Sequence, residues 1–508
     1  MGAKPDMFEV GPYSYRETTI YNYKVPGSFL KDGTEFTYTK TTKYEFDPAT
    51  SCQGCSENDT FIMPDILFFK LADVLLDPEA VCTLLSSIFN PDSPVQSNCL
   101  DSPVDGELET VLNIILRVLL KDSNFTIGDH PIELLCDLLS VMITADGGGP
   151  FLPIKVHEIL WDGYNDPIVS RLILEIERIF ESALNITLPD ISTPPVAINQ
   201  KVKTSLPYTM NTGTNNYLQT GAVLLYNNSK TLPDAFWNGW QCHVNDTDSC
   251  IPPQHLDIMD LSAKAFASEA STTSASNCEC EVCSNETASL ASKLKGTTGD
   301  FFHALVEKSD RLSVLVDDIC RTMDFIYQEE SKVQDIDTYR FIIDPSMFSS
   351  SNHDNCGYCR KLPRDMYGRE AGSYCLPDGV LDLSGCEQLN ADIIVSNPHF
   401  YGAAKEVRQM FPYLKQDANQ DQTTLDIEPT TGTVLAANKR LQINYLFKNY
   451  PGPFQALTSG VYPILWLNES YMMDPHTHDQ IKSEIHMKRK MISTSDSSGS
   501  QMSRDRRK

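Results

Sequence analysis

The first fifty residues alternate between aromatic or apolar positions and polar ones, and this alternation limits the fold more than any other feature of the sequence. It is clearest in YSYRETTIYNY at 13–23 and TEFTYTKTTKYEFDP at 34–48. A period of two residues, rich in Tyr, Thr and Phe, is typical of strands with one buried face. Similar runs return late in the chain, in YRFIID at 339–344, RLQINYLF at 440–447 and YPILWL at 462–467. The sequence therefore predicts strand-rich regions at both ends of the chain.

From Phe61 to Asp146 the apolar residues instead repeat every three or four positions, which predicts helices. One face is formed by Leu108, Val111, Leu112, Ile115 and Leu119, and another by Leu135, Leu138, Leu139 and Met142; Phe61–Phe89 and Arg171–Leu184 are further helical candidates. The block 61–146 holds 14 acidic and 3 basic residues, a net charge of −11. This charge suits either the solvated face of a small helical bundle or a partner-selecting surface that repels polyanions.

Fifteen cysteines are too many for incidental use, and several are clustered. Cys278, Cys280 and Cys283 could bind zinc with a distant thiolate, or they could pair as disulfides in an oxidising compartment. Spacing alone leaves both alternatives open. These cysteines lie within 254–300, a segment rich in Ala, Ser and Thr that we expect to be an inserted surface loop.

The common catalytic signatures are missing from the sequence. It contains no GxSxG nucleophile motif, no Gly-rich phosphate-binding loop and no HExxH zinc helix. His157–Glu158 lacks a second His one turn later. We therefore expect a protein that is not an enzyme and has no cofactor.

The formal charge of −27 argues against a nucleic-acid partner, because phosphate neutralisation requires Lys and Arg. Charge is also uneven. Residues 481–508 hold eight basic and three acidic residues, so this stretch carries +5 and the first 480 residues carry −32. We expect 481–508 to be a disordered basic tail. No apolar stretch reaches the roughly 20 residues that a membrane span requires, and the first residues lack an apolar signal core.

Asn-X-Ser/Thr sequons are candidate glycosylation sites, although about half could arise by chance in a chain this rich in Asn, Ser and Thr. They lie at Asn58, Asn124, Asn185, Asn227, Asn245, Asn285 and Asn468.

A series of short motifs, in a fixed order over some 460 residues, carries a resemblance to a known family. They include EVGPYSYRE at 9–17, YEFDPATS at 44–51, EILWDGYNDP at 158–167, CHVNDTD at 242–248, VEKSDRLSVLVDDICR at 306–321, YRFIIDPSMF at 339–348, NPHF at 397–400, LDIEPTTG and NKRLQINYLF within 425–447, and YPILWLNES at 462–470. With them, the chain resembles the class B scavenger receptors, a family that includes the fatty-acid translocase and the lysosomal integral membrane protein.

The resemblance implies an α+β ectodomain over 1–480: a large, mostly antiparallel β-barrel with a helical apex bundle, here at 61–146, and an internal lipid tunnel. It implies a receptor in the plasma or lysosomal membrane that binds a fatty acid, sterol or lipoprotein and passes lipid through the tunnel to the membrane. The ligand-binding residues stay unknown. An alternative is a lysosomal-type sorting receptor whose acidic apex binds a cargo protein, with His130 as a pH switch.

The family pattern also implies three disulfides: Cys242–Cys356, Cys320–Cys386 and Cys359–Cys375. They favour an oxidising compartment and weaken the zinc alternative. The chain departs from the family in an extra residue, Asp162, where the family has LWGY. The family's two membrane anchors are absent from this sequence, and we expect a truncated form of a longer protein rather than a soluble isoform.

Overall fold

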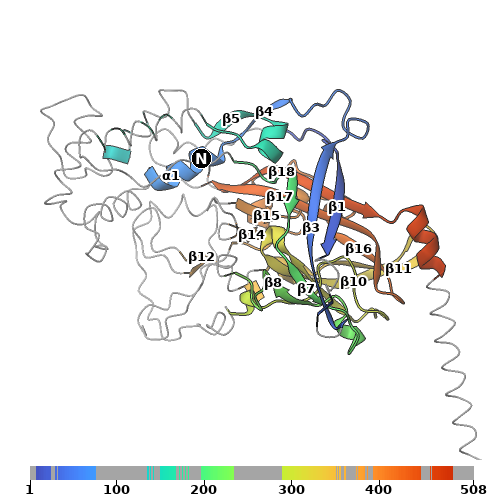
Figure 1. Cartoon of the computed structure of the whole chain (residues 1–508). Coiled ribbons are helices and arrows are strands. Elements are labelled where there is room, and N and C mark those ends of the chain that lie inside the picture. Colours follow the sequence, from blue (N-terminus) through green and yellow to red (C-terminus); the bar gives the residue numbers. More distant parts are fainter. Residues whose placement is uncertain are drawn as a thin grey trace, which may run out of the picture.

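The computed structural model describes residues 7–23, 29–30, 33–75, 149–166, 196–233, 289–349, 376–383, 393–447 and 460–483, together with isolated positions between them. Two antiparallel sheets make up most of this part of the chain (Figure 1). The smaller sheet, which contains β1 and β3, lies on one side of the larger sheet, which contains β17 and β18.

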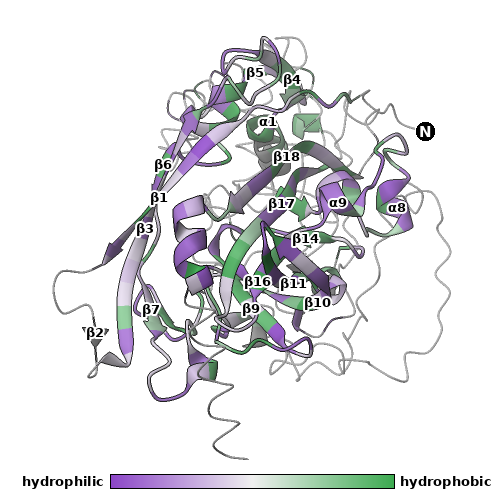
Figure 2. Ribbon diagram, turned by 90° about the vertical axis from the view of Figure 1, so that its right-hand side faces the viewer, coloured by the Kyte–Doolittle hydropathy of each residue, from purple (hydrophilic) through white to green (hydrophobic). Residues whose placement is uncertain are grey.

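The smaller sheet has six strands in the order β1-β3-β7-β8, with β2 and β6 also paired to β3. Its strands are β1 (Tyr15–Tyr23), β2 (Phe29–Leu30), β3 (Glu35–Phe46), β6 (Val202–Thr204), β7 (Tyr208–Asn211) and β8 (Val223–Tyr226). The long strands β1 and β3 confirm the alternation in the first fifty residues. They carry mostly polar side chains (Figure 2), as expected of strands with one solvated face.

The larger sheet has eight strands in the order β14-β15-β17-β16-β11-β10-β9, with β18 paired to the other edge of β17. They are β9 (Arg311–Val316), β10 (Arg321–Val333), β11 (Ile336–Ile343), β14 (Val380–Asp382), β15 (Ile393–Ser396), β16 (Thr424–Glu428), β17 (Thr433–Phe447) and β18 (Gly460–Met472). The runs YRFIID, RLQINYLF and YPILWL form β11, β17 and β18, as the sequence predicted.

The expectation of a mostly antiparallel α+β fold is confirmed, since all strand pairs are antiparallel and the described helices are few. The predicted closed barrel is not found among the described strands. Their pairings end at β1 and β8 in one sheet and at β9, β14 and β18 in the other, which leaves both sheets open.

The predicted start of the helical block at Phe61 is wrong. Residues Thr60–Pro64 form strand β4, which pairs with β5 (Phe151–Lys155), and helix α1 begins at Ile66 and ends at Leu75. The run is only five residues long, too short for its periodicity to separate a strand from a helix. The short helices α8 (Lys405–Arg408) and α9 (Ala418–Asp421) are also described, and β12 (Arg360–Lys361) pairs with β13 (Ser373–Tyr374).

Other predicted helices are described only in part. Residues 134–136 and 138 are helical with inward-facing side chains, as predicted for the face that contains Leu135 and Leu138. Arg171, Leu174, Arg178 and Glu181 are helical and exposed. The helix predicted at Leu108–Leu119 lies outside the described residues.

Two segment boundaries differ from those expected. Residues 289–300, the end of the predicted surface loop, pack against the larger sheet, where Ala291 is buried and the Thr297 N–H donates to the Ser313 carbonyl. Residues 475–483 are helical, and Ile481 packs against a small core that contains Val333 and Met473. This helix crosses the boundary expected at residue 480, and residues 484–508 lie outside the description.

Helix α1 is tied to the larger sheet by an aromatic cluster. The Phe69 ring lies 4.9 Å from Tyr445 and 4.4 Å from Phe447, and Phe447 lies 4.1 Å from Tyr462, measured between ring centroids. All four side chains are fully buried. Such packing fixes the direction in which the chain leaves the sheet toward the predicted apical block.

The start of α1 is fixed by a buried carboxyl group. Asp65 Oδ1 accepts hydrogen bonds from the N–H groups of Leu67 and Phe68, the arrangement of a helix N-cap, and from the Tyr164 hydroxyl. Burial, together with a hydrogen bond and repulsion from the buried Asp166 carboxyl, raises the pKa of Asp65 to about 8. The two carboxyl groups therefore share a proton near neutral pH.

This shared proton predicts a pH-dependent stability. The folded protein binds a proton here more tightly than the unfolded chain, so the stabilisation is present at acid pH and is lost as the pH rises toward about 8. We expect the free energy of unfolding to fall by roughly 1–3 kcal/mol between pH 5 and 7.5 from this pair alone. Asp166→Asn, which keeps a hydrogen-bond donor, flattens this dependence in urea unfolding. An unchanged slope in the variant would contradict the assignment.

Candidate ligand site between the two sheets

The structure contains the Cys320–Cys386 disulfide, with the two Cα atoms 5.7 Å apart. It also joins Cys52 to Cys55, a pair that the sequence left unassigned. Cys242, Cys356, Cys359 and Cys375 lie outside the described residues, as do His130 and the cluster of Cys278, Cys280 and Cys283, so those pairings and the zinc alternative stay predictions. In the described part of the chain, no cluster of His, Cys, Asp and Glu could hold a metal ion.

Three of the seven sequons can be placed. Asn58, Asn227 and Asn468 are all exposed, so each is accessible to glycosylation. Asn124, Asn185, Asn245 and Asn285 lie outside the described residues and stay predictions.

A cluster of charged side chains joins the two sheets, and we call it the inter-sheet cluster: Glu17, Lys203, Asp318, Lys439 and Glu469. Lys439 of β17 lies 2.7 Å from Asp318 Oδ2 and 2.9 Å from Glu469 Oε2, measured from Nζ. Lys203 of β6 reaches across to Asp318 Oδ1 at 2.7 Å. Asp318 follows β9 in a short 3-10 turn. One carboxylate therefore links a lysine from each sheet.

These charges depend strongly on one another. Attraction to Lys439, together with Lys203, holds the pKa of Asp318 below its usual range in spite of burial. Removal from water lowers the pKa of Lys439, but Asp318 and Glu469 outweigh this and keep it well above its ordinary value. Burial and repulsion from Glu469 raise the pKa of Glu17. The lysine is thus held charged, and Glu17 is a weaker acid than an ordinary glutamate.

The Lys439 and Glu469 side chains are nevertheless about one third exposed, at 32% and 31%. Both charged groups therefore keep some contact with solvent. The next positions on the same face of β17 and β18 are apolar: Leu441 lies opposite Leu467, and both are half-buried. A charged group and a partly covered apolar surface therefore lie side by side.

Aromatic rings lie next to the inter-sheet cluster, because Tyr44 of β3 pairs with Glu17 of β1. Trp161 stacks on Tyr44 at 4.8 Å and meets Tyr15 edge-on at 4.9 Å, between ring centroids. Trp161 lies in a π-helical turn, Glu158–Asp162. Such a turn holds one residue more than a regular helical turn, and Asp162 is its last residue. The Asp162 carboxylate lies 2.7 Å from His157 Nδ1 at the start of the turn.

The inter-sheet cluster was not predicted from the sequence, although all of its members except Lys203 lie within the quoted motifs. Glu17 shares its strand face with Tyr15 and Tyr21, and Lys439 shares its face with Leu441 and Ile443. A charge at a half-buried position of an alternating strand is the signal that could have identified Lys439, whereas Glu17 is exposed on β1 and gives no such signal. Chemically, the site offers an apolar surface, aromatic faces, three carboxyl groups and two lysines.

Comparisons with known proteins agree with the resemblance seen in the sequence. The sequence pattern of the CD36 family matches residues 1–282 and 273–497, which together cover nearly the whole chain. The chain belongs to the CD36 family. Its members include class B scavenger receptors, so the family predicted from the motifs is confirmed.

The relatives are spread across animals. An uncharacterized protein of Caenorhabditis elegans is 30% identical over 95% of this chain and 76% of its own length. Lysosome membrane protein 2 of Mus musculus is 25% identical over 79% of this chain and 68% of its own length. Sensory neuron membrane protein 2 of Aedes aegypti is 25% identical over 93% of this chain and 78% of its own length. Both named relatives are membrane proteins. Within the described residues of this chain, no helix is long and apolar enough to cross a membrane.

Proposed function

We propose that this chain is the ectodomain of a class B scavenger-type receptor that binds a fatty acid, sterol or lipoprotein lipid between its two sheets. Lipid then passes along a tunnel in a barrel-like ectodomain to a plasma or lysosomal membrane. No catalysis and no cofactor are involved. Membership of the CD36 family supports the receptor class, because its members are receptors rather than enzymes.

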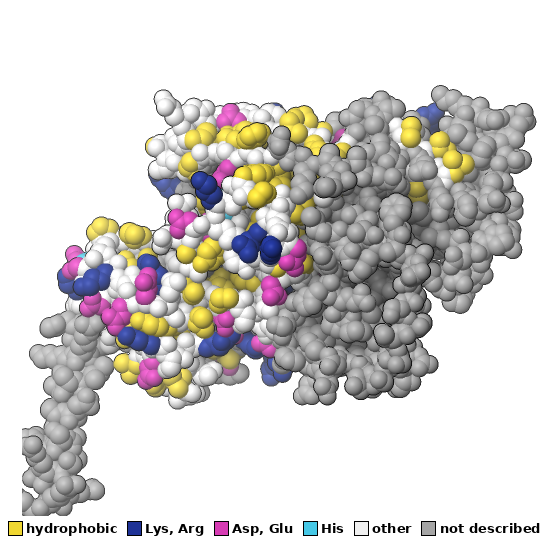
Figure 3. Space-filling view, turned by 180° about the vertical axis from the view of Figure 1, so that it is seen from behind, with side chains coloured by type: hydrophobic (Ala, Val, Ile, Leu, Met, Phe, Trp, Pro, Cys, Tyr) yellow, Lys and Arg dark blue, Asp and Glu magenta, His cyan; other side chains and the backbone are white. Residues whose placement is uncertain are grey.

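The observation that carries the lipid proposal is the half-buried surface around Leu441, Leu465 and Leu467 beside the inter-sheet cluster. Each methylene of an acyl chain that leaves water there contributes roughly 0.8 kcal/mol, so few polar contacts are required for affinity. The face seen in Figure 3 offers less continuous apolar surface to an acyl chain, because apolar, basic and acidic side chains are interleaved there.

A bulky side chain on this surface tests the proposal. Leu467→Trp fills the space that about two methylenes of a bound chain would occupy, so we expect at least tenfold weaker binding of a fluorescent fatty acid. Ser470→Trp is the matched control, because Ser470 lies on the same strand, on its opposite face, and is exposed. Thermal unfolding of both variants monitors the fold. Equal affinity in the two variants would rule out this surface as the lipid site.

The alternative function is a sorting receptor whose acidic apical block at 61–146 binds a cargo protein. The similarity to lysosome membrane protein 2 is the observation that supports this alternative. Capture of one intact protein by the full chain at pH 7.5, with release near pH 5 and no effect of Leu467→Trp, would support cargo sorting over lipid transfer.

A further inference from the structure

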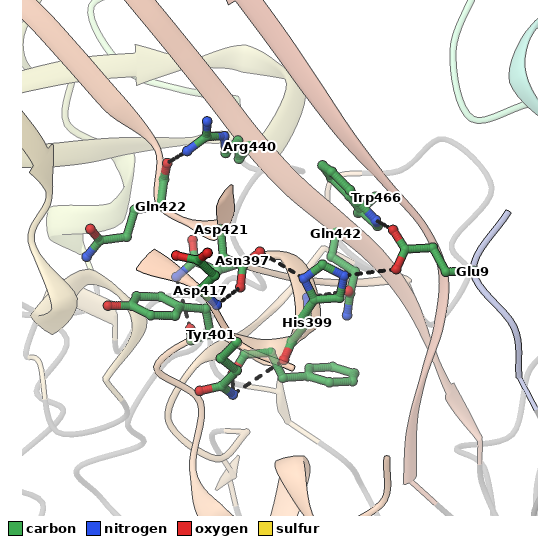
Figure 4. A network of polar contacts seen from close by, with 12 residues as sticks. Glu9, Asn397, His399, Tyr401, Asp417, Asp421, Gln422, Arg440, Gln442 and Trp466 are labelled. Atoms are coloured by element: carbon green, nitrogen blue, oxygen red, sulfur yellow. Dashed lines mark hydrogen bonds and ion pairs between the residues drawn. The ribbon is translucent and has the colours of Figure 1, made fainter. Parts of the chain in front are cut away.

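His399 lies between two carboxylates that come from opposite ends of the chain (Figure 4). Its Nδ1 is 2.8 Å from Asp421 Oδ1, and its Nε2 is 3.2 Å from Glu9 Oε2. Glu9 belongs to the N-terminal segment 7–14, and Asp421 ends helix α9. The indole N–H of Trp466 donates to the other Glu9 oxygen at 2.6 Å. Glu9 is thus held by one imidazole and one indole.

The imidazole has little freedom to turn away from these partners. His399 has a left-handed backbone conformation, with φ 54°, and its N–H donates to Gln442 Oε1 at 2.8 Å. The ring meets Trp466 edge-on at 5.6 Å and is 11% exposed. Asp421 is fully buried and accepts the Asp417 N–H on its second oxygen. The Glu9 carboxylate, 52% exposed, is the most exposed of the three groups.

The charged groups around His399 come from three parts of the chain. Glu9 comes from the N-terminal segment, Asp417 and Asp421 from the region of α9, and Arg440 from β17, where it acts on the two aspartates. Gln442 and Trp466 are neutral. Removal from water lowers the pKa of His399, but its contacts with Asp421 and Glu9 outweigh this and raise the pKa above its ordinary value.

Both ring nitrogens can donate hydrogen bonds only when the imidazole carries two protons. A neutral ring has one N–H. The buried Asp421 keeps it, because that contact is shorter and an unpaired buried carboxylate is costly. The lone pair of Nε2 then faces the Glu9 carboxylate, and the contact turns from attractive to repulsive.

We infer that His399 and Glu9 form a proton-controlled latch that holds the segment 7–10 against β18 at acid pH and releases it as the pH rises. The rest of the N-terminal segment is held independently. The Cys52 N–H donates to the Pro12 carbonyl, and the Tyr13 hydroxyl donates to Asp59. Release is therefore confined to the residues before Gly11, where Phe8 is 86% exposed, Val10 is 53% exposed and Met7 is half-buried against the core.

The first measurement is the pKa of His399 itself, from deuterium exchange at its ring C2 position, read by mass spectrometry on the full chain. We expect a value above the ordinary histidine value of about 6.5, and a measurable fall in Glu9→Ala. A His399 pKa that Glu9→Ala leaves unchanged would overturn the latch.

The second measurement is chymotrypsin cleavage after Phe8, normalised to a free peptide of the same sequence at each pH. We expect cleavage of the wild type to be at least fivefold faster at pH 8 than at pH 6. Cleavage of Glu9→Ala is fast at both pH values. In Glu9→Gln the cleavage rate no longer depends on pH, because the amide can donate a hydrogen bond to the neutral imidazole. In His399→Gln the rate no longer depends on pH because the glutamine side chain does not titrate. His476→Gln is the control variant, in which cleavage keeps the pH dependence of the wild type. Equal wild-type rates at the two pH values would exclude the latch.

Discussion

Removal of the Cys320–Cys386 disulfide, in the double variant Cys320→Ser/Cys386→Ser, lowers the free energy of unfolding by about 4 kcal/mol. The two cysteines are 66 residues apart, and a bridge over a loop of that length removes much conformational entropy from the unfolded chain. Cys320 is also buried, so the serine hydroxyl adds a desolvation cost at the same position. Urea unfolding at pH 7 measures the difference.

The Cys52–Cys55 bridge provides an internal comparison. It closes a separation of only three residues, for which the same entropic relation gives about 2 kcal/mol. We therefore expect Cys52→Ser/Cys55→Ser to cost about half as much. Equal losses for the two double variants would show that loop length does not govern these bridges.

The longer bridge also supports the proposed ligand site. Cys320 follows Asp318 by two residues, at the end of the 3-10 turn Asp317–Ile319, and has a left-handed backbone conformation with φ 55°. The disulfide therefore fixes the turn that carries the central carboxylate of the inter-sheet cluster. We expect its removal to weaken ligand binding as well as folding.

The strands with strong alternation were predictable from the sequence, and the short ones were not. β1, β3, β11, β17 and β18 are long enough for a two-residue period to be clear. β4 has five residues and adjoins the Asp65 cap of α1, so its apolar positions merged with those of the following helix. Alternation also cannot say whether sheets close, because closure depends on which edges meet.

The candidate site was harder to predict because its members are far apart in the sequence. Asp318 lies 115 residues from Lys203 and 121 from Lys439, and Glu9 lies 390 residues from His399. Strand parity could have identified Lys439 as a half-buried charge, but it could not have paired it with Asp318 or Glu469. The one local signal was Asp162, whose extra position in the motif corresponds to the π-helical turn that carries Trp161.

Lys439→Met is expected to lower the free energy of unfolding by about 3 kcal/mol at pH 7.5, the lower end of the range for breaking a buried ion pair, because the side chain keeps about a third of its exposure. In this variant the carboxyl groups of Asp318, Glu469 and Glu17 remain close together, and Lys203 is the one lysine of the inter-sheet cluster left to offset their charge. Lys332→Met is the matched control: its pair with Asp337 is 69% and 68% exposed, so its loss costs less than about 1 kcal/mol.

The pH dependence of this effect separates charge from packing. Without Lys439, the crowded carboxylates take up protons more readily in the folded protein than in the unfolded chain, so protonation relieves the repulsion as the pH falls. The loss in Lys439→Met should therefore shrink between pH 7.5 and 5, and Lys439→Met/Glu469→Gln should recover part of it at pH 7.5. Urea unfolding of the three variants measures these differences. A loss that is the same at both pH values would show that Lys439 acts through the packing of its aliphatic stem, and that the two sheets are not joined by charge.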